Sequence, residues 1–163
     1  MRARYCYMVA ALVIAADQAS KLAVTRCLDY AEPVPLLPSL NFTLMHNTGA
    51  AFSMLAHAAG WQRWLFGGLA VLASLFIVMT LNRIEPAQRW LRTALALILG
   101  GALGNLVDRI RFGYVVDFID FYYGDWHFAA FNVADSAITV GAAMLIVQSL
   151  FFGNSTSSPS RAR

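Results

Sequence analysis

Two aspartates lie beside long apolar segments, where a carboxylate is costly. Asp117 follows the mostly apolar segment 113–116, and Asp135 lies at the start of the last hydrophobic stretch of the chain. Charged side chains close to a bilayer are rare and usually functional. Because a pair of carboxylates can act as general acid and general base, we interpret Asp117 and Asp135 as a candidate acid–base pair.

Further polar residues recur at helical spacing near the ends of apolar segments. Asp17 and Lys21 are four residues apart, so they share one helix face and can pair. This pair is either a simple ion pair at a helix end or a brace for the wall of a site. Asn105, Asp108 and Arg109 follow the spacing i, i+3, i+4 and also face one way. Arg109 can pair with a carboxylate or with a phospholipid head group.

Two other polar patterns have both a structural and a functional interpretation. Asn132 is three residues before Asp135, so it belongs either to a site or to the N-cap of the last helix, with Asp135 at the N3 position. Asn47 and Gly49 are typical of a turn. However, the small residues after Asn47 leave room for the close approach of a backbone, and its amide offers both a donor and an acceptor.

The remaining motifs exclude several classes of site. Gly100 and Gly104 form a small-xxx-small face suited to helix packing, and no strand precedes them as a dinucleotide-binding motif requires. The histidines are scattered singly and neither cysteine has a metal-ligand spacing, so no metal site is predicted. Lys21 is the only lysine and no basic stripe is present, which argues against nucleic acid as a partner.

The composition points to a membrane protein. The chain is 59% apolar and 13% charged, whereas soluble domains carry roughly 25% charged residues. A helix that crosses a bilayer needs roughly 17–25 mostly apolar residues. Four segments are candidates: residues 5–24, 64–81, 93–107 and 134–152. The first, third and fourth segments must include polar residues at one end to reach this length. If the helices alternate in direction, these polar ends lie on the same side of the membrane. The sequence therefore predicts four transmembrane helices around one polar site.

Arginines precede the first predicted helix, separate the second from the third, and follow the fourth. They are Arg2, Arg4, Arg83, Arg89, Arg92, Arg161 and Arg163. The positive-inside rule makes these regions cytoplasmic, which leaves the polar cluster at the outer ends of the helices. The first segment is similar to a secretory signal peptide, but no small-x-small cleavage pattern follows it. We therefore interpret it as a retained signal anchor.

Two segments outside the helices are predicted to be extended. Residues 40–46 partly alternate, and residues 112–123 are rich in β-branched and aromatic side chains. A small extracytoplasmic β-sheet that cradles a peptide fits both. We expect residues 1–152 to form a single integral membrane domain, all-α with this small β element, and the Ser/Pro/Arg-rich cytoplasmic tail 153–163 to be disordered. The small-residue segment 53–60 is a candidate gate.

These motifs, taken in order, closely resemble those of lipoprotein signal peptidase, the bacterial signal peptidase II. The resemblance covers roughly residues 5–152, and its blocks are Asp17-Gln18-Ala19-Ser20-Lys21, Asn47-Thr48-Gly49-Ala50-Ala51-Phe52, Gly100-Gly101-x-x-Gly104-Asn105-x-x-Asp108-Arg109, Val115-Val116-Asp117-Phe118 and Phe131-Asn132-x-Ala134-Asp135. The family consists of aspartic endopeptidases of the bacterial inner membrane. They cleave diacylglyceryl-modified prolipoproteins just before the lipidated cysteine, and the cyclic peptide globomycin inhibits them.

The resemblance implies a role for each matching residue, and no cofactor. It assigns catalysis to Asp117 and Asp135. The residues implied to line the site and hold the substrate are Asn47, Gly49, Asn105, Arg109 and Asn132. Those implied to support the site are Asp17, Lys21, Gly101, Gly104, Asp108, Val116 and Ala134. One carboxylate would be ionised to activate water while the other, protonated, would donate to the carbonyl oxygen, as expected of two carboxylates that share a proton.

Two other classes of function use membrane carboxylates. A small transporter or proton relay would need polar residues at both ends of the bundle, and none is expected at the cytoplasmic ends. An enzyme acting on lipid head groups could use Arg109 as a phosphate clamp, but no histidine lies in the motif cluster. Ion flux, lipid turnover and cleavage of a lipid-modified peptide distinguish the three classes.

Overall fold

The computed structural model describes residues 3–49 and 61–152. The predictions for the segment 53–60, for the tail 153–163 and for the terminal arginines Arg2, Arg161 and Arg163 lie outside the described residues.

Four long helices account for most of the described chain. They are α1 (Ala3–Cys27), α2 (Gln62–Arg83), α3 (Arg89–Phe112) and α4 (Val133–Phe152). Each is long and apolar enough to cross a membrane, which confirms the four predicted spans. Helices α1, α2 and α3 also reach beyond their predicted apolar cores, because the polar residues at their ends continue the helix, whereas α4 keeps its predicted bounds to within one residue.

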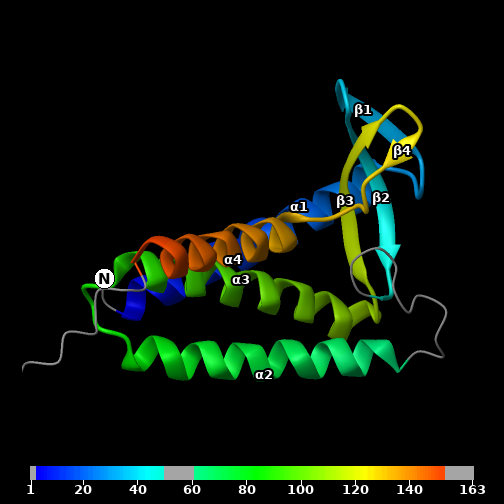
Figure 1. The fold of residues 1–163 in the computed structure, drawn as a ribbon. Coiled ribbons are helices and arrows are strands. Elements are labelled where there is room, and N and C mark those ends of the chain that lie inside the picture. Colours follow the sequence, from blue (N-terminus) through cyan, green and yellow to red (C-terminus); the bar gives the residue numbers. More distant parts are fainter. Residues whose placement is uncertain (1–2, 50–60, 153–163) are drawn as a thin grey trace, which may run out of the picture.

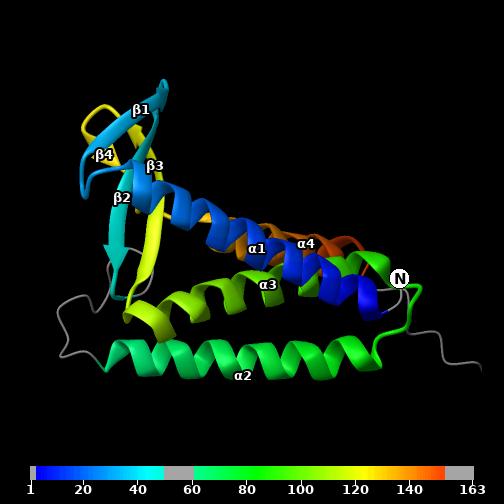
Figure 2. The same cartoon turned by 180° about the vertical axis from the view of Figure 1, so that it is seen from behind.

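Helix α3 is the centre of the bundle, between α2 on one side and α1 and α4 on the other (Figures 1 and 2). About 56% of its candidate span is buried, against 17–22% for the other three helices. Lipid tails are as apolar as leucine, so membrane helices associate mainly through close packing of small residues. Gly100 serves this purpose, because a Cβ there would lie 2.7 Å from the Cβ of Val13 on α1.

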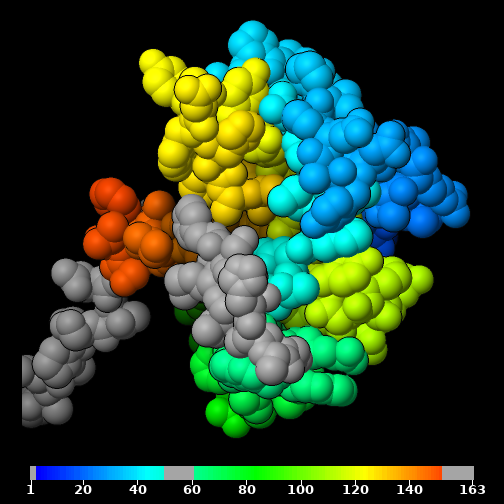
Figure 3. All heavy atoms as spheres, turned by 90° about the vertical axis from the view of Figure 1, so that its right-hand side faces the viewer, coloured from blue at the N-terminus to red at the C-terminus, as the bar shows by residue number. Residues whose placement is uncertain are grey.

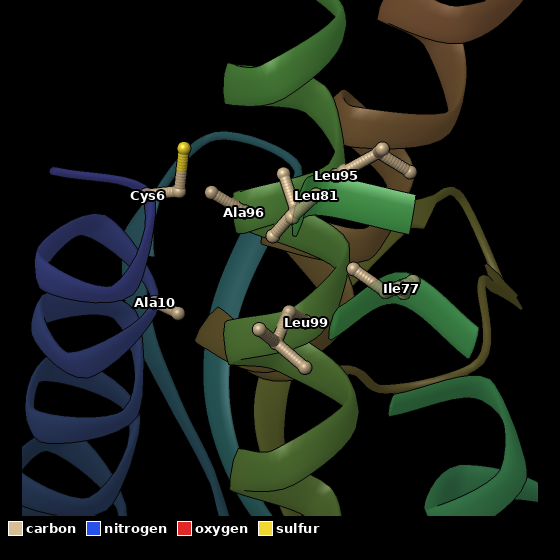
Figure 4. Packing of buried hydrophobic residues seen from close by; sticks show 7 residues of the cluster. All are labelled: Cys6, Ala10, Ile77, Leu81, Leu95, Ala96 and Leu99. Carbon is tan, nitrogen blue, oxygen red and sulfur yellow. The ribbon is translucent and has the colours of Figure 1, made fainter. Parts of the chain in front are cut away.

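One apolar cluster holds the three helices α1, α2 and α3 together at the end far from the sheet. Its buried members are Cys6, Ala10, Ile77, Leu81, Leu95, Ala96 and Leu99. Figure 4 shows that Cys6 and Ala10 come from α1, while Leu99 on α3 points into the space between the helices. Alanines and a cysteine occupy the α1 contact, which allows that helix to approach α3 closely.

A four-stranded antiparallel sheet stands at one end of the bundle (Figure 1). Its strands, β1 (Pro33–Leu37), β2 (Leu40–Asn47), β3 (Val115–Tyr123) and β4 (Trp126–His127), are ordered β1-β2-β3-β4. The segments predicted to be extended correspond to β2 and β3, except that Phe112 still belongs to α3 and residues 113–114 precede the strand. Strand β1 was not predicted because it contains two prolines, but an edge strand tolerates residues that lack an N–H.

The sheet lies where α1 and α3 end and where α2 and α4 begin, which we call the sheet end of the bundle (Figures 1 and 2). The start of α1, the α2–α3 connection and the end of α4 lie at the opposite end. The helices therefore alternate in direction as predicted. Gly113 ends α3 in the left-handed conformation (φ 84°) and directs the chain into β3. This turn brings Asp117 back over the end of α3.

The expectation that no polar side chain serves the opposite end is wrong. Arg92 is buried there, and its guanidinium donates a hydrogen bond to the carbonyl oxygen of Ile84. The physical reason is that the last carbonyl groups of α2 have no partner within their own helix and need a donor. A cation near a helix C-terminus also interacts favourably with the helix dipole.

Candidate active site

The two aspartates of the candidate pair come from different elements at the sheet end. Asp117 is the third residue of β3, and its side chain is only 2% exposed. Its carboxylate accepts hydrogen bonds from the side-chain amides of Asn132 (2.7 Å) and Asn47 (3.0 Å). Asp135 lies in the first turn of α4, and its Oδ1 accepts a hydrogen bond of 2.7 Å from the amide of Asn105. Each carboxylate is therefore held by asparagine donors from other elements.

Asn132 belongs to the helix cap and to the site at the same time. Its Oδ1 accepts from the backbone N–H of Asp135 at 2.9 Å, while Oδ2 of Asp135 accepts from the backbone N–H of Asn132 at 3.3 Å. This reciprocal pair is the capping arrangement considered from the sequence. The amide nitrogen of the same Asn132 donates to Asp117, so the cap joins the first turn of α4 to the carboxylate on β3.

A buried cation, Lys21, lies beside Asn105. Lys21, which is 4% exposed, forms ion pairs with Asp17 (2.8 Å) and Asp108 (2.9 Å) and donates to Oδ1 of Asn105 (2.9 Å). These contacts use all three donors of the ammonium group. Because Oδ1 of Asn105 accepts from Lys21, its amide nitrogen is left to donate to Asp135. The interpretation of Asp17 and Lys21 as a simple ion pair at a helix end is wrong, since both side chains are buried in a larger network.

The two buried carboxylates also anchor the elements that carry the candidate pair. Oδ1 of Asp17 accepts from the backbone N–H of Ala134 at 3.0 Å, directly before Asp135. Oδ2 of Asp108 accepts from the backbone N–H of Val116 at 3.1 Å, directly before Asp117. The side chains on α1 and α3 thereby fix the start of α4 and the start of β3.

Small residues allow α3 to reach both neighbouring helices at this level. A Cβ on Gly104 would lie 2.8 Å from Oδ2 of Asp17 and 3.4 Å from the Cβ of Ala134. A Cβ on Gly101 would overlap the carbonyl oxygen of Ala134. The glycines of the motif therefore act through packing, the structural role suggested by their spacing.

Arg109 lies at the sheet end of α3, beside the candidate pair. Its guanidinium contacts the carbonyl oxygens of Gly49 (3.4 Å) and Asn105 (3.5 Å) and lies over the ring of Phe66, 5.5 Å from its centroid. The backbone N–H of Gly49 donates to Oδ1 of Asn47 at 3.0 Å, which is the turn predicted for this segment. The turn leaves the Asn47 amide nitrogen free to hold Asp117.

Two cavities meet at the candidate pair. The first, of about 550 Å³, is lined by Asp135, Asn105, Arg109 and Gly49 and extends along α4 to Ile138, Thr139 and Val140. The second, of about 370 Å³, is lined by Asp117 and by residues of the sheet. Asn47, Phe128, Ala129 and Ala130 line both cavities. The two aspartates thus face adjoining spaces that share one wall.

Burial changes the proton affinity of Asp117. Loss of solvation and, second, the negative charge of Asp135 raise the pKa of Asp117 to about 7. The amide donors of Asn47 and Asn132 and the charge of Lys21 lower this pKa, but they do not outweigh burial. A carboxyl group with a pKa in this range can hold a proton and release it near neutral pH, which is the property required of a general acid or base.

Sequence reasoning missed some polar residues of this region. Gln18 was quoted within a motif but given no role, although its amide donates to Asp108 (2.8 Å) and to Asp17 (3.2 Å). Its distance of three residues from Lys21 was the available signal, because that spacing places both on one helix face. Asp120 and His127 pair across the sheet at 2.9 Å, which no sequence pattern indicated because β4 has only two residues.

Fold and site together define a multi-pass membrane protein with a pair of aspartates joined by hydrogen-bonding asparagines at the sheet end of its bundle. The sequence model of the family described as "Signal peptidase (SPase) II" matches residues 9–151. The chain therefore belongs to the signal peptidase II family and is a peptidase, as its motifs predict.

Individual relatives agree with this assignment. The chain is 54% identical over 140 residues to the lipoprotein signal peptidase of Acinetobacter baylyi, covering 86% of this chain and 78% of that protein. It is 46% identical to the lipoprotein signal peptidase of Shigella boydii over 98% of this chain and 93% of the other. A solved structure described as a bacterial membrane enzyme has a TM-score of 0.81 at 27% identity, covering 97% of this chain and 94% of that one.

Proposed function

We propose that this protein is an aspartic endopeptidase that removes the signal peptide from diacylglyceryl-modified prolipoproteins, cutting just before the lipidated cysteine. Residues 1–152 act as one peptidase domain in the bacterial inner membrane, with both termini cytoplasmic and the sheet end at the outer leaflet. The observation that carries the proposal is that Asn132 caps the helix that bears Asp135 while donating to Asp117, which holds the two carboxyl groups in one hydrogen-bonded unit.

The chemistry follows from one proton shared between the two carboxyl groups. The ionised carboxylate removes a proton from water as the water oxygen attacks the scissile carbonyl carbon. The protonated carboxyl group donates its proton to the carbonyl oxygen, which gives a neutral tetrahedral intermediate. When this intermediate collapses, the C–N bond breaks, the departing amine takes the proton that the first carboxylate removed from water, and a hydroxyl group of the intermediate returns its proton to the other carboxylate, which restores the shared proton. The raised pKa of Asp117 supports the protonated form of one member at neutral pH.

The remaining site residues have roles that match their positions. Arg109 and Asn47 line the first cavity and offer donors to the substrate backbone, while Asn105 keeps Asp135 in place. The apolar wall of that cavity along α4 suits the membrane side of the substrate or its acyl chains. Membrane phospholipid borders the same exposed helix faces. Globomycin would inhibit by occupying this site.

The decisive experiment measures cleavage of a lipid-modified propeptide by the purified enzyme reconstituted in lipid. Asp117→Asn and Asp135→Asn each should abolish cleavage, because neither variant can share a proton between two carboxyl groups. Asp125→Asn is the matched control, since Asp125 is an exposed aspartate in the turn before β4 and should leave cleavage intact. Thermal unfolding in detergent checks that each variant is folded. Robust processing by either dyad variant would overturn the proposal.

A further inference from the structure

The second cavity is built entirely outside the helices. Its lining comes from β1, β2, β3, β4 and their connections, namely Ala31, Pro33, Thr43, Met45, His46, Asn47, Asp117, Asp120, His127, Phe128, Ala129 and Ala130. The first cavity, in contrast, follows α4. Figure 3 looks onto this end of the molecule, where the yellow β3–β4 region lies beside the blue and cyan strands β1 and β2. One cavity thus extends along a membrane helix and the other along the sheet.

The candidate catalytic pair lies at the junction between the two cavities. Asp135 lines the first, Asp117 lines the second, and Asn47 lines both. A peptide bond attacked between these carboxyl groups has one side of the substrate in each cavity. The side that remains in the membrane fits the cavity along α4. The polypeptide that follows the cleaved bond leaves the membrane and fits the cavity over the sheet.

The second cavity has a polar group that the catalytic mechanism does not use. Asp120, which is 6% exposed, accepts a hydrogen bond from the hydroxyl of Thr43 (3.1 Å) and pairs with Nδ1 of His127 (2.9 Å). The side chain of His127 is about half exposed, so the pair is accessible from the solvent side. Among the lining residues in the described part of the chain, no lysine or arginine compensates Asp117 and Asp120.

We propose that this second cavity is the subsite for the residue that follows the lipid-bearing cysteine, and that Asp120 makes it select against an acidic side chain there. The inference rests on the proposed function, because it needs the scissile bond between Asp117 and Asp135. An incoming carboxylate meets two aspartates, Asp117 and Asp120, and two histidines, His46 and His127, of which His127 is already paired with Asp120. An incoming ammonium group gains a buried carboxylate partner.

The expected discrimination follows from the charges. Unit charges about 6 Å apart at an effective dielectric constant of about 80 change an equilibrium roughly threefold, so attraction of a lysine and repulsion of a glutamate together give a difference of about tenfold. We therefore expect kcat/KM for a substrate with lysine after the cysteine to exceed that for the glutamate substrate by about tenfold. A glutamine substrate should lie between them. The effect should weaken as ionic strength rises, since the cavity is open to solvent.

The test compares three lipid-modified peptides that differ only in lysine, glutamine or glutamate after the modified cysteine. The readout is the ratio of kcat/KM for the lysine and glutamate substrates, in which any general loss of activity cancels. Asp120→Asn should bring this ratio to within about threefold of unity, because the selecting charge is gone. His127→Lys should lower the ratio too, because it places a permanent cation beside Asp120. This second substitution is at a half-exposed position, so it serves where Asp120→Asn fails to fold.

Asp125→Asn removes the same charge from the exposed turn before β4, outside the cavity, and should keep the wild-type ratio. A wild-type ratio near unity would overturn the inference. So would a ratio unchanged in both Asp120→Asn and His127→Lys. Neither result would affect the proposed function. That function fails separately if Asp117→Asn or Asp135→Asn still cleaves any of the peptides.

Discussion

A single methyl group at Gly101 should separate the catalytic role of α4 from its role as a membrane helix. A Cβ at this position would overlap the carbonyl oxygen of Ala134, the residue directly before Asp135. The obstacle is backbone rather than the end of a flexible side chain, so α3 and the first turn of α4 must move apart. Overpacking of this kind costs about 1–3 kcal/mol, and the better helix propensity of alanine returns about 1 kcal/mol. The net loss of stability is therefore small.

The catalytic effect of Gly101→Ala should be much larger. A displacement of the helix start by about 1 Å moves Asp135 away from its partner, and a misplacement of that size can reduce kcat roughly 100-fold. The assay combines kcat in lipid nanodiscs with thermal unfolding of the same samples. We expect kcat to fall by about two orders of magnitude while the protein remains folded.

Gly68→Ala is the matched control for this substitution. Gly68 also lies within a membrane helix, but a Cβ there would meet no heavy atom within 4 Å. This variant should keep full activity and gain up to about 1 kcal/mol of stability. If Gly101→Ala had wild-type kcat, the start of α4 would not define the catalytic geometry, and the reasoning would be refuted.

Three further predictions concern the polar network. The pKa of Asp117 is raised to about 7, so the folded protein keeps a proton that the unfolded chain releases above about pH 4. The free energy of unfolding should therefore fall as pH rises from about 4 to 7. Asp117→Asn should remove this dependence on pH when unfolding is measured across that range. Lys21→Met leaves two buried carboxylates without their cation and should lower the free energy of unfolding, measured with denaturant, by about 3–5 kcal/mol. The control Arg26→Met, at the exposed end of α1, should lower it by less than about 1 kcal/mol. Asn132→Ser keeps a capping oxygen but loses the amide that donates to Asp117, so kcat should fall, and the buried acceptors left without a donor should cost about 1–3 kcal/mol of stability. Asn132→Ala also loses the cap and should be less stable still, and equal kcat values for Asn132→Ser and wild type would contradict the role assigned to the amide.

The sequence predicts the helices well and the sheet only in part, for identifiable reasons. Apolar length alone identifies the membrane spans, because the bilayer sets a minimum length. Strand β2 shows partial alternation, but β1 is hidden by its prolines and β4 by having two residues. The pairing of Asp120 with His127 depends on the β3–β4 register, which aligns Tyr122 with His127, and the two residues of β4 are too few to show the alternation that specifies a register.

For the site, spacing reveals which residues share a face but not which atoms meet. The spacing of Asp17 and Lys21 predicts their ion pair, yet it cannot show that Asp108 completes the coordination of the ammonium group. Similarly, the capping and catalytic interpretations of Asn132 are alternatives in the sequence. In the structure both are compatible, because its oxygen caps α4 while its nitrogen donates to Asp117. The sequence does not show this because it depends on the long-range placement of β3 beside the residues that precede α4.

The buried lysine explains how two carboxyl groups from different elements can be held in one place. Its ammonium group has three donors, and they are directed to Asp17, Asp108 and Asn105. Asp17 then fixes the backbone before Asp135, Asp108 fixes the backbone before Asp117, and Asn105 holds the Asp135 side chain itself. Lys21 thus reaches the Asp135 side chain through Asn105, and it reaches the backbone beside the two aspartates through Asp17 and Asp108. Because the ammonium group is nearly inaccessible to solvent, its charge is weakly screened, and the positions of both aspartates depend on the same cation.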